Sequence, residues 1–324
     1  MVRSLVTQLS HQCVRILPGF EALFSTCENG QRQPSLNALL NVLQELINDF
    51  PSTYFVIDAL DECKNRGELM RIIKTISTWQ SQGLHMLFTS RREGDIKLTL
   101  ESILDSQNIL CIQTDAVDHD IQLYVRQQLK DDESLRKWQT NDAIRKRIET
   151  SLREKAHGMF RLAACQLDIL RRCRNRKQLL SALDSLPPDL DETYNRILGA
   201  IKGDDIIYAV RILRWLTFSL EPLSLLEVAE VVALDADRHP AFDRDEVLED
   251  HSDILSICSS LVTTTVSRFR KEPVVLLAHY SVKEYLVSGR ILDSEAKMYG
   301  MENALCHSTI AKCCIGYLLQ FDTE

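Results

Sequence analysis

Two short apolar segments with a helical pattern between them constrain the fold of this chain more than any other feature. Residues 54–57 read YFVI and residues 84–89 read LHMLFT, while residues 67–80 place apolar side chains at helical spacing. Short runs rich in β-branched and aromatic side chains are typical of buried strands. The order strand, helix, strand predicts an α/β fold with a parallel sheet, and a further strand is expected at residues 108–112.

Outside this segment the apolar residues follow helical spacing. Helices are predicted at residues 2–9 and from residue 35, and no strand pattern occurs between residues 115 and 260. Helix starts are marked at residues 189–192, where Asp189 and Glu192 follow two prolines, and at the capping boxes of residues 224–227 and 281–284.

The last third of the chain has the pattern of a winged helix. Three helical segments are predicted at residues 206–216, from residue 224 and at residues 253–260. Two β-rich runs follow at residues 261–266 and 274–278. Three helices followed by a hairpin form the outline of that domain.

Composition and charge exclude several classes of protein. Apolar residues make up 45% of the chain and charged residues 26%, as in ordinary globular proteins. No apolar run is long enough to span a bilayer, and the first residues lack a signal-peptide core, so a cytoplasmic protein is expected. The ten cysteines form no C-x-x-C pair, which leaves a zinc site without support. A hydrolase with a serine nucleophile is excluded, because the chain contains no G-x-S-x-G elbow to carry it.

The net charge of −8 is unevenly distributed. Residues 126–178 contain 15 Lys and Arg against 7 Asp and Glu. These charges alternate with apolar residues and lack interleaved aromatics, which favours a solvated helical face, or one docked on the acidic remainder, over a nucleic-acid site. Residues 245–261, the expected recognition helix of a DNA-binding winged helix, contain acidic residues and no Lys or Arg. Since DNA phosphates would be repelled, no nucleic-acid partner is expected.

The first predicted strand ends in an acidic cluster, residues 58–62 (DALDE). A carboxylate at the carboxyl end of a buried parallel strand lies where such sheets bind ligands. Asp58 is therefore a candidate for holding Mg²⁺ through water, and Asp61 or Glu62 for orienting an attacking water. The alternative is an acidic helix N-terminus that follows a strand.

The second predicted strand ends in a hydroxyl and a guanidinium, those of Thr89 and Arg91. Arg binds phosphate oxygens in a bidentate way, so these side chains are candidates for contacting a γ-phosphate. A solvated surface turn is the alternative for this segment alone. The spacing of the two strand ends favours a nucleotide site.

Five segments, in order along the chain, resemble the motifs of fungal NACHT ATPases, which are STAND-class P-loop NTPases. Residues 55–63 look like the extended Walker B motif and residues 87–91 like the sensor 1 strand. Residues 155–163 resemble the helical-domain motif, and residues 186–194 resemble the linker into the winged helix. Residues 277–286 are similar to a winged-helix motif whose histidine senses nucleotide.

The resemblance implies a NLR-like switch between ADP and ATP states that signals through protein partners, often in fungal non-self recognition or programmed cell death. Asp58 would hold Mg²⁺, Asp61 and Glu62 would serve hydrolysis, Arg91 would sense the γ-phosphate, and His279 would contact the ADP phosphates. For His279, the alternative is a histidine that is hydrogen-bonded within the winged helix.

The same resemblance implies the domain organisation. Residues 1–115 would form the carboxyl-terminal part of a nephrocystin-like nucleotide-binding core, and residues 116–203 a helical subdomain. Residues 204–290 would form a winged helix like that of GPI inositol-deacylase-like proteins, followed by a helical segment at residues 291–324.

The chain departs from the family in its phosphate-binding loop. It contains no G-x-x-x-x-G-K-[ST] motif, and none of its glycines is followed by Lys. Phe160 stands where plant-type relatives carry a proline that touches adenine. Without the backbone cradle of that loop, weak nucleotide binding is expected, as for a truncated or degenerate relative. The alternative function is a nucleotide-independent module that binds intact relatives.

Overall fold

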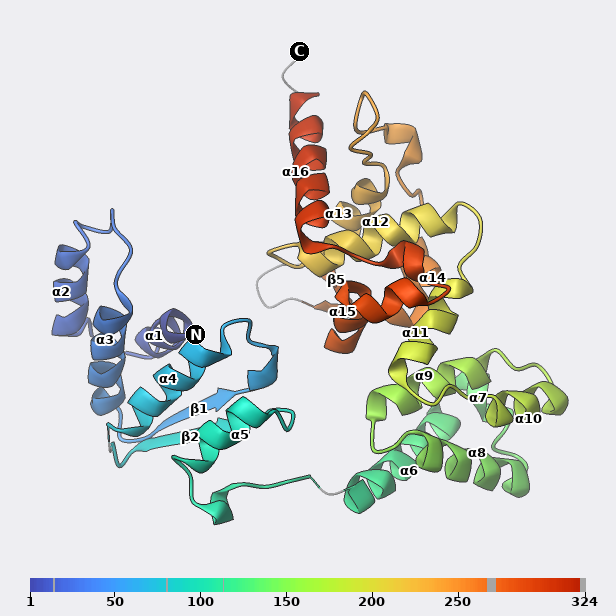
Figure 1. Ribbon diagram of the computed structural model, residues 1–324, viewed down its shortest axis with the longest axis horizontal. Helices are drawn as coiled ribbons and strands as arrows, with labels where there is room; N and C mark the ends of the chain where they lie inside the picture. The colour runs from blue at the N-terminus through green and yellow to red at the C-terminus, as the bar shows by residue number, and fades with distance from the viewer. Residues whose placement is uncertain (14, 80, 113, 267–271, 321–324) are drawn as a thin grey trace. The chain divides into compact units, whose positions relative to one another are not determined.

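The computed structural model describes residues 1–324 except 14, 80, 113, 267–271 and 321–324, and it divides into two compact units (Figure 1). The first unit contains residues 1–111 and the second residues 112–324. The chain is of mixed α/β class, with helices predominant and small sheets.

The first unit is built on two parallel strands, as predicted. β1 (Thr53–Ile57) pairs with β2 (Leu84–Phe88), in a register that places Thr53 opposite Leu84 and Ile57 opposite Phe88. The crossover is α4 (Arg66–Ser77). Because the strands run in the same direction, the residues that follow them lie at one edge of the sheet.

One face of this sheet is covered and the other is exposed. Helices α1 (Val2–Ser10), α3 (Leu36–Asp49) and α4 contribute to a core that includes Phe55 of β1. The side chains on the opposite face of β1 are exposed, with Tyr54 at 72% and Val56 at 67%. Ser35 caps α3, as its sequence pattern indicates.

Two helices of the first unit lie outside the predicted pattern, and one predicted strand is wrong. The helices are α2 (Pro18–Thr26) and α5 (Gly94–Glu101). Residues 108–112 form no strand, and Leu110 and Ile112 are 90% and 82% exposed. An apolar, β-branched segment forms a strand only where it pairs with a neighbouring strand and packs against a surface. Within the described part of the chain, residues 108–112 do neither.

The second unit begins with a group of helices, most of which pack around one core, while the last of them packs into a second core with the later helices of the unit. Their bounds are α6 (Thr114–Asp131), α7 (Glu133–Arg136), α8 (Asp142–Lys155), α9 (Phe160–Arg171), α10 (Arg176–Asp184) and α11 (Leu190–Gly199). Several arginines of the basic segment pair with carboxylates of these same helices. Arg126 lies 2.8 Å from Glu149, and Arg147 lies 3.1 Å from Asp184.

The winged-helix pattern is confirmed. Its helices are α12 (Asp205–Phe218), α13 (Leu225–Val232) and α14 (Asp253–Cys258). An antiparallel sheet in the order β3-β5-β4 contains β3 (Leu223–Ser224), β4 (Val262–Val266) and β5 (Pro273–Leu277). Two more helices follow, α15 (Tyr280–Val287) and α16 (Asn303–Leu319).

The capping predictions have different outcomes. Asp189 accepts a hydrogen bond from the backbone N–H of Glu192, and Ser224 with Glu227 forms the expected reciprocal box. The capping box predicted at Ser281 is wrong, because α15 begins two residues earlier than that box implies, with His279 as its N-cap. The Ser281 hydroxyl instead lies 2.8 Å from the hydroxyl of Tyr194.

Among the described residues, no helix is both long and apolar enough to cross a membrane.

The register of β1 and β2 depends on a close backbone approach at Gly83. A Cβ at this position would lie 2.6 Å from the carbonyl oxygen of Pro51, and the Gly83 carbonyl accepts the Thr53 N–H at 2.7 Å. We expect Gly83→Ala to reduce the free energy of unfolding by about 1–3 kcal/mol, as overpacking does. Chemical denaturation of the whole chain, followed by circular dichroism, measures this change.

Gly67 provides the matched control for this substitution. It lies in the first turn of α4, and a Cβ there would meet no atom within 4 Å. Gly67→Ala should be neutral or stabilising by up to about 1 kcal/mol, because alanine favours helix. Equal losses in the two variants would contradict the importance of the Gly83 approach.

Candidate functional site

The ends of β1 and β2 are joined by side chains of the residues that follow them. The Thr89 hydroxyl donates to the carboxylate of Asp58, and it accepts the Ala59 N–H at 2.9 Å. The backbone continues the pairing, since the Leu60 N–H donates to the Thr89 carbonyl at 3.0 Å. Asp58 and Thr89, the candidates that follow the carboxyl ends of the two strands, are therefore in direct contact.

A tight turn redirects the chain after Asp58. Ala59 has the left-handed backbone conformation, with φ 53° and ψ 55°, and residues Leu60–Glu62 form a 3-10 turn. A left-handed conformation costs a residue with a side chain about 1 kcal/mol. The left-handed residue lies where the chain turns from the end of β1 back toward β2. This turn brings Asp61 beside Arg91.

Asp61 anchors the segment that follows β2. One carboxylate oxygen, Oδ1, accepts the Arg91 N–H at 2.9 Å and lies 3.3 Å from the Ser90 hydroxyl. The other, Oδ2, lies 3.3 Å from Nε of Arg91. The Asp61 side chain is only 7% exposed, whereas that of Arg91 is 49% exposed. Arg91 therefore reaches solvent while its backbone is held by Asp61.

The environment of Asp61 lowers its pKa. Burial alone raises the pKa of this carboxyl, but the hydrogen bonds from backbone N–H groups and from Ser90, with the charge of Arg91, favour the ionised form more strongly. An ionised carboxylate with these donors is suited to positioning residues 90–91. The predicted role of Asp61 and Glu62 in orienting a water stays a prediction, and Glu62 is exposed.

Arg66 completes the site and was not singled out by its sequence. It donates two hydrogen bonds to the Asp61 carbonyl, at 2.9 and 2.6 Å, and lies 3.4 Å from Glu93. As the first residue of α4 it places a cation at a helix N-terminus, where the helix dipole is unfavourable. A cation at that position indicates a tertiary partner, and this signal was available in the sequence.

The residues at the strand ends fit Mg²⁺ only if water and phosphate oxygens supply part of its coordination shell. The described residues contain no group of three or more His, Cys, Asp or Glu able to enclose a metal ion. Asp58 and Thr89 supply a carboxylate and a hydroxyl on exposed residues. Mg²⁺ is commonly held by one or two carboxylates together with water and phosphate oxygens, so this pair matches that arrangement and no dedicated cage.

His279 belongs to the second unit, where it starts α15. Its Nδ1 accepts the Ser281 N–H at 3.1 Å and lies 2.7 Å from the Ser281 hydroxyl. The prediction that its ring lies beside a helix N-terminus is confirmed, and the ring itself provides the cap. Its approach to Asp58 and Arg91 stays a prediction.

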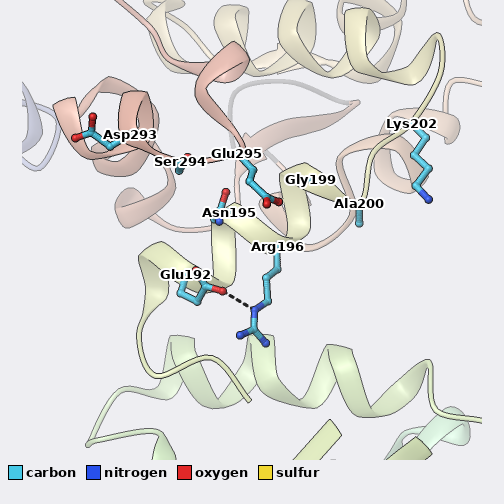
Figure 2. Close-up of a pocket in the computed structure, with 9 residues that line it drawn as sticks. All are labelled: Glu192, Asn195, Arg196, Gly199, Ala200, Lys202, Asp293, Ser294 and Glu295. Carbon is cyan, nitrogen blue, oxygen red and sulfur yellow. Dashed lines mark hydrogen bonds and ion pairs between the residues drawn. The ribbon is translucent and has the colours of Figure 1, made fainter. Parts of the chain in front are cut away.

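The candidate residues of the strand ends and His279 do not line the pocket drawn in Figure 2. Figure 2 shows this pocket of about 770 Å³, in which Glu192 and Arg196 of α11 form an ion pair at 2.7 Å. The residues around it are Glu192, Asn195, Arg196, Gly199, Ala200, Lys202, Asp293, Ser294 and Glu295. The lining contains three carboxylates and two cations, so no single ligand charge is strongly favoured.

Two protein-family models match parts of this chain. One, described as Nephrocystin 3, N-terminal, matches residues 1–91, which end at Arg91 of the site. The other, described as GPI inositol-deacylase, winged helix domain, matches residues 194–298 and so includes part of α11 as well as the winged helix.

Two curated fungal proteins are similar to this chain. Azaphilone pigments biosynthesis cluster protein L of Monascus ruber is 35% identical over 149 residues, 45% of this chain and 32% of the relative. Vegetative incompatibility protein HET-E-1 of Podospora anserina is 26% identical over 239 residues, 72% of this chain and 16% of the relative. The chain thus spans less than a third of either relative. The matches show similarity to two fungal proteins, each over part of the chain.

The lowered pKa of Asp61 predicts a pH-dependent contribution to stability. Its unfolded-state pKa is about 3.9, so the contribution is fully present above that value and is lost as the pH falls through the lower folded-state value. We expect Asp61→Asn to reduce the thermal unfolding midpoint at neutral pH. The difference from the parent should narrow as the pH falls through the lowered folded-state pKa of Asp61, because both proteins then lack the charge.

Asp95→Asn is the matched control for the pH series. Asp95 lies 3.8 Å from Arg66, but its side chain is 55% exposed, so its removal should have little effect at any pH. A difference between Asp61→Asn and the parent that shows no narrowing as the pH is lowered from neutral until both proteins unfold in acid would show that the ionised carboxylate is not the anchor.

Proposed function

We propose that this chain is a module of a NACHT-type signalling switch, and that its first unit carries part of a Mg²⁺-nucleotide site. The carrying observation is the common edge of β1 and β2, where Asp58 contacts Thr89 and Asp61 holds Arg91. In open α/β sheets, ligands bind outside the carboxyl ends of the strands. The similarity to a fungal vegetative incompatibility protein supports a signalling role.

Each residue of this edge has a distinct role in the proposal. Asp58 and Thr89 present oxygens toward a cation, and bound Mg²⁺ would supply charge neutralisation for the phosphates. The Arg91 side chain is 49% exposed, and in the proposal its guanidinium contacts the terminal phosphate while Asp61 fixes the backbone from which it projects. Glu62 remains the candidate for orienting water.

Nucleotide binding by this chain should be weak. A P-loop provides a set of backbone N–H groups and a lysine for the β- and γ-phosphates, and the sequence contains no such motif. Only side chains of the strand ends are left to hold the phosphates. We therefore expect a dissociation constant weaker than micromolar for Mg²⁺-ATP.

A nucleotide-independent interaction module is the second candidate. The observation that favours it is the engagement of Asp61, whose carboxylate serves the fold through Arg91 and Ser90. In that case the helical part and the winged helix would bind intact relatives, and the strand-end site would be a structural remnant. Both candidate functions predict a cytoplasmic location.

Titration of the chain with Mg²⁺-ATP, followed by amide chemical shifts, separates the two candidates. The nucleotide proposal predicts shifts confined in the first unit to residues 58–62 and 89–91, with weaker than micromolar affinity. Asp58→Asn should reduce the affinity and remove its dependence on Mg²⁺, because the cation loses its carboxylate.

The control for this titration is Asp49→Asn. Asp49 is paired with Arg15 at 2.9 Å and precedes β1, at the opposite end of the strands from Asp58. It should leave nucleotide binding unchanged. Absence of shifts at both strand ends would overturn the nucleotide proposal in favour of the interaction module, and micromolar or tighter binding would overturn the expected weakness.

A further inference from the structure

A continuous chain of polar groups runs through the second unit from α9 to the N-terminus of α15. Arg161 donates through Nε to the Tyr194 hydroxyl at 3.4 Å, and this hydroxyl lies 2.8 Å from that of Ser281. The Ser281 hydroxyl in turn lies 2.7 Å from Nδ1 of His279. These four residues, here called the polar relay, come from α9, α11 and α15 (Figure 1).

Tyr194 and Ser281, the two middle residues of the polar relay, are enclosed by protein. Tyr194 is fully buried and Ser281 is 9% exposed. Burial raises the pKa of the Tyr194 hydroxyl, so it stays protonated and acts as a neutral donor and acceptor. Buried hydroxyls with defined partners have few alternative arrangements, because a lost hydrogen bond leaves an unsatisfied polar group.

The direction of each hydrogen bond follows from the two ends. A guanidinium only donates, so the Tyr194 oxygen accepts from Arg161, and we assign the Tyr194 proton to the Ser281 oxygen 2.8 Å away, the hydroxyl that this buried group contacts. At the other end, a backbone N–H only donates, so Nδ1 of His279 accepts from Ser281 N–H. The Ser281 hydroxyl, which accepts from Tyr194, then donates to the same Nδ1. The neutral imidazole therefore carries its proton on Nε2.

We propose that Arg161, Tyr194 and Ser281 are positioning residues that hold His279 as its Nε2–H tautomer and make this state depend on the placement of α9. The arginine also donates to the Ser260 carbonyl at 2.5 Å, so it links α9 to the segment before β4. Displacement of α9 would withdraw the cation from Tyr194. The Ser281 hydroxyl would then be able to donate to Tyr194 instead of to His279.

This arrangement gives the imidazole a defined chemistry. An Nε2–H group is a hydrogen-bond donor and suits an anionic oxygen, such as that of a phosphate, better than a cation. That use of the ring rests on the proposed function, whereas the tautomer and its dependence on Arg161 rest on the contacts alone. The relay is therefore tested without nucleotide, and its failure is distinct from a failure of phosphate binding.

Long-range ¹H–¹⁵N spectra of the histidine rings in the full chain test the relay at neutral pH. The His279 signals are assigned by their loss in His279→Gln. We expect a protonated Nε2 and a hydrogen-bonded, unprotonated Nδ1 in the parent protein. In Tyr194→Phe and in Arg161→Met the Nδ1 resonance of His279 should shift, although neither substitution alters the cap formed with Ser281 N–H.

Tyr285→Phe is the matched control for the tyrosine. Tyr285 is also buried, and its ring lies 5.8 Å from that of Tyr194, but its hydroxyl donates to Ser294 and lies outside the relay. It should leave the His279 resonances in place. Circular dichroism and the unfolding midpoint establish that each variant is folded.

If Tyr194→Phe does not fold, Ser281→Ala replaces it. This variant keeps the backbone N–H that donates to Nδ1, so it should keep the proton on Nε2 and shift Nδ1 toward an acceptor of a single hydrogen bond. A proton on Nδ1 in the parent would overturn the proposal. So would His279 resonances that stay unmoved in the folded Arg161 variant and in the folded Tyr194 or Ser281 variant, which would reduce the ring to a local helix cap.

Discussion

The parallel register of β1 with β2 is the constraint on which the candidate site depends. Pairing Ile57 with Phe88 makes Asp58 and Thr89 the next residues of the two strands, and their side chains meet there. A shift of one residue would exchange the faces of a strand and separate these groups. The strand faces fix the register from within, since Phe55 is buried in the core while Tyr54 and Val56 are exposed. The close approach at Gly83 fixes it at the other end of the strands.

Asp58 and Asp61 lie in different environments at this edge of the sheet and suit different roles. Asp58 is exposed and contacts one hydroxyl, whereas Asp61 is nearly enclosed and receives donors from Ser90 and Arg91. A general base is most effective when its pKa lies near the working pH, and the pKa of Asp61 is lowered away from that range. Asp61 is thus better suited to holding Arg91 in place than to removing a proton. Under the proposed function, such a site would favour recognition of a nucleotide state over rapid hydrolysis.

How far the sequence predicts this structure depends on how local each signal is. The strands β1 and β2, the Ser224 capping box and the winged-helix order follow from short-range patterns, and all are present. The strand expected at residues 108–112 is absent because apolar character alone supplies no neighbouring strand. His279, and not Ser281, caps α15 because Tyr194, 87 positions earlier in the chain, engages the serine hydroxyl. Contacts of this range leave no periodic trace in a single sequence.

Helix α11 links the helical part of the second unit to the winged helix. One face of α11 directs Tyr194 into the core that it shares with α15, and another face holds the segment after α15. There Asn195 accepts the Ala296 N–H at 3.1 Å, and Asp191 lies 3.2 Å from Arg290. The winged-helix family model likewise begins within α11, at residue 194. In the proposed relay, a movement of α9 against α11 would reach the N-terminus of α15 through the contacts of Arg161, Tyr194 and Ser281, without passing through a linker.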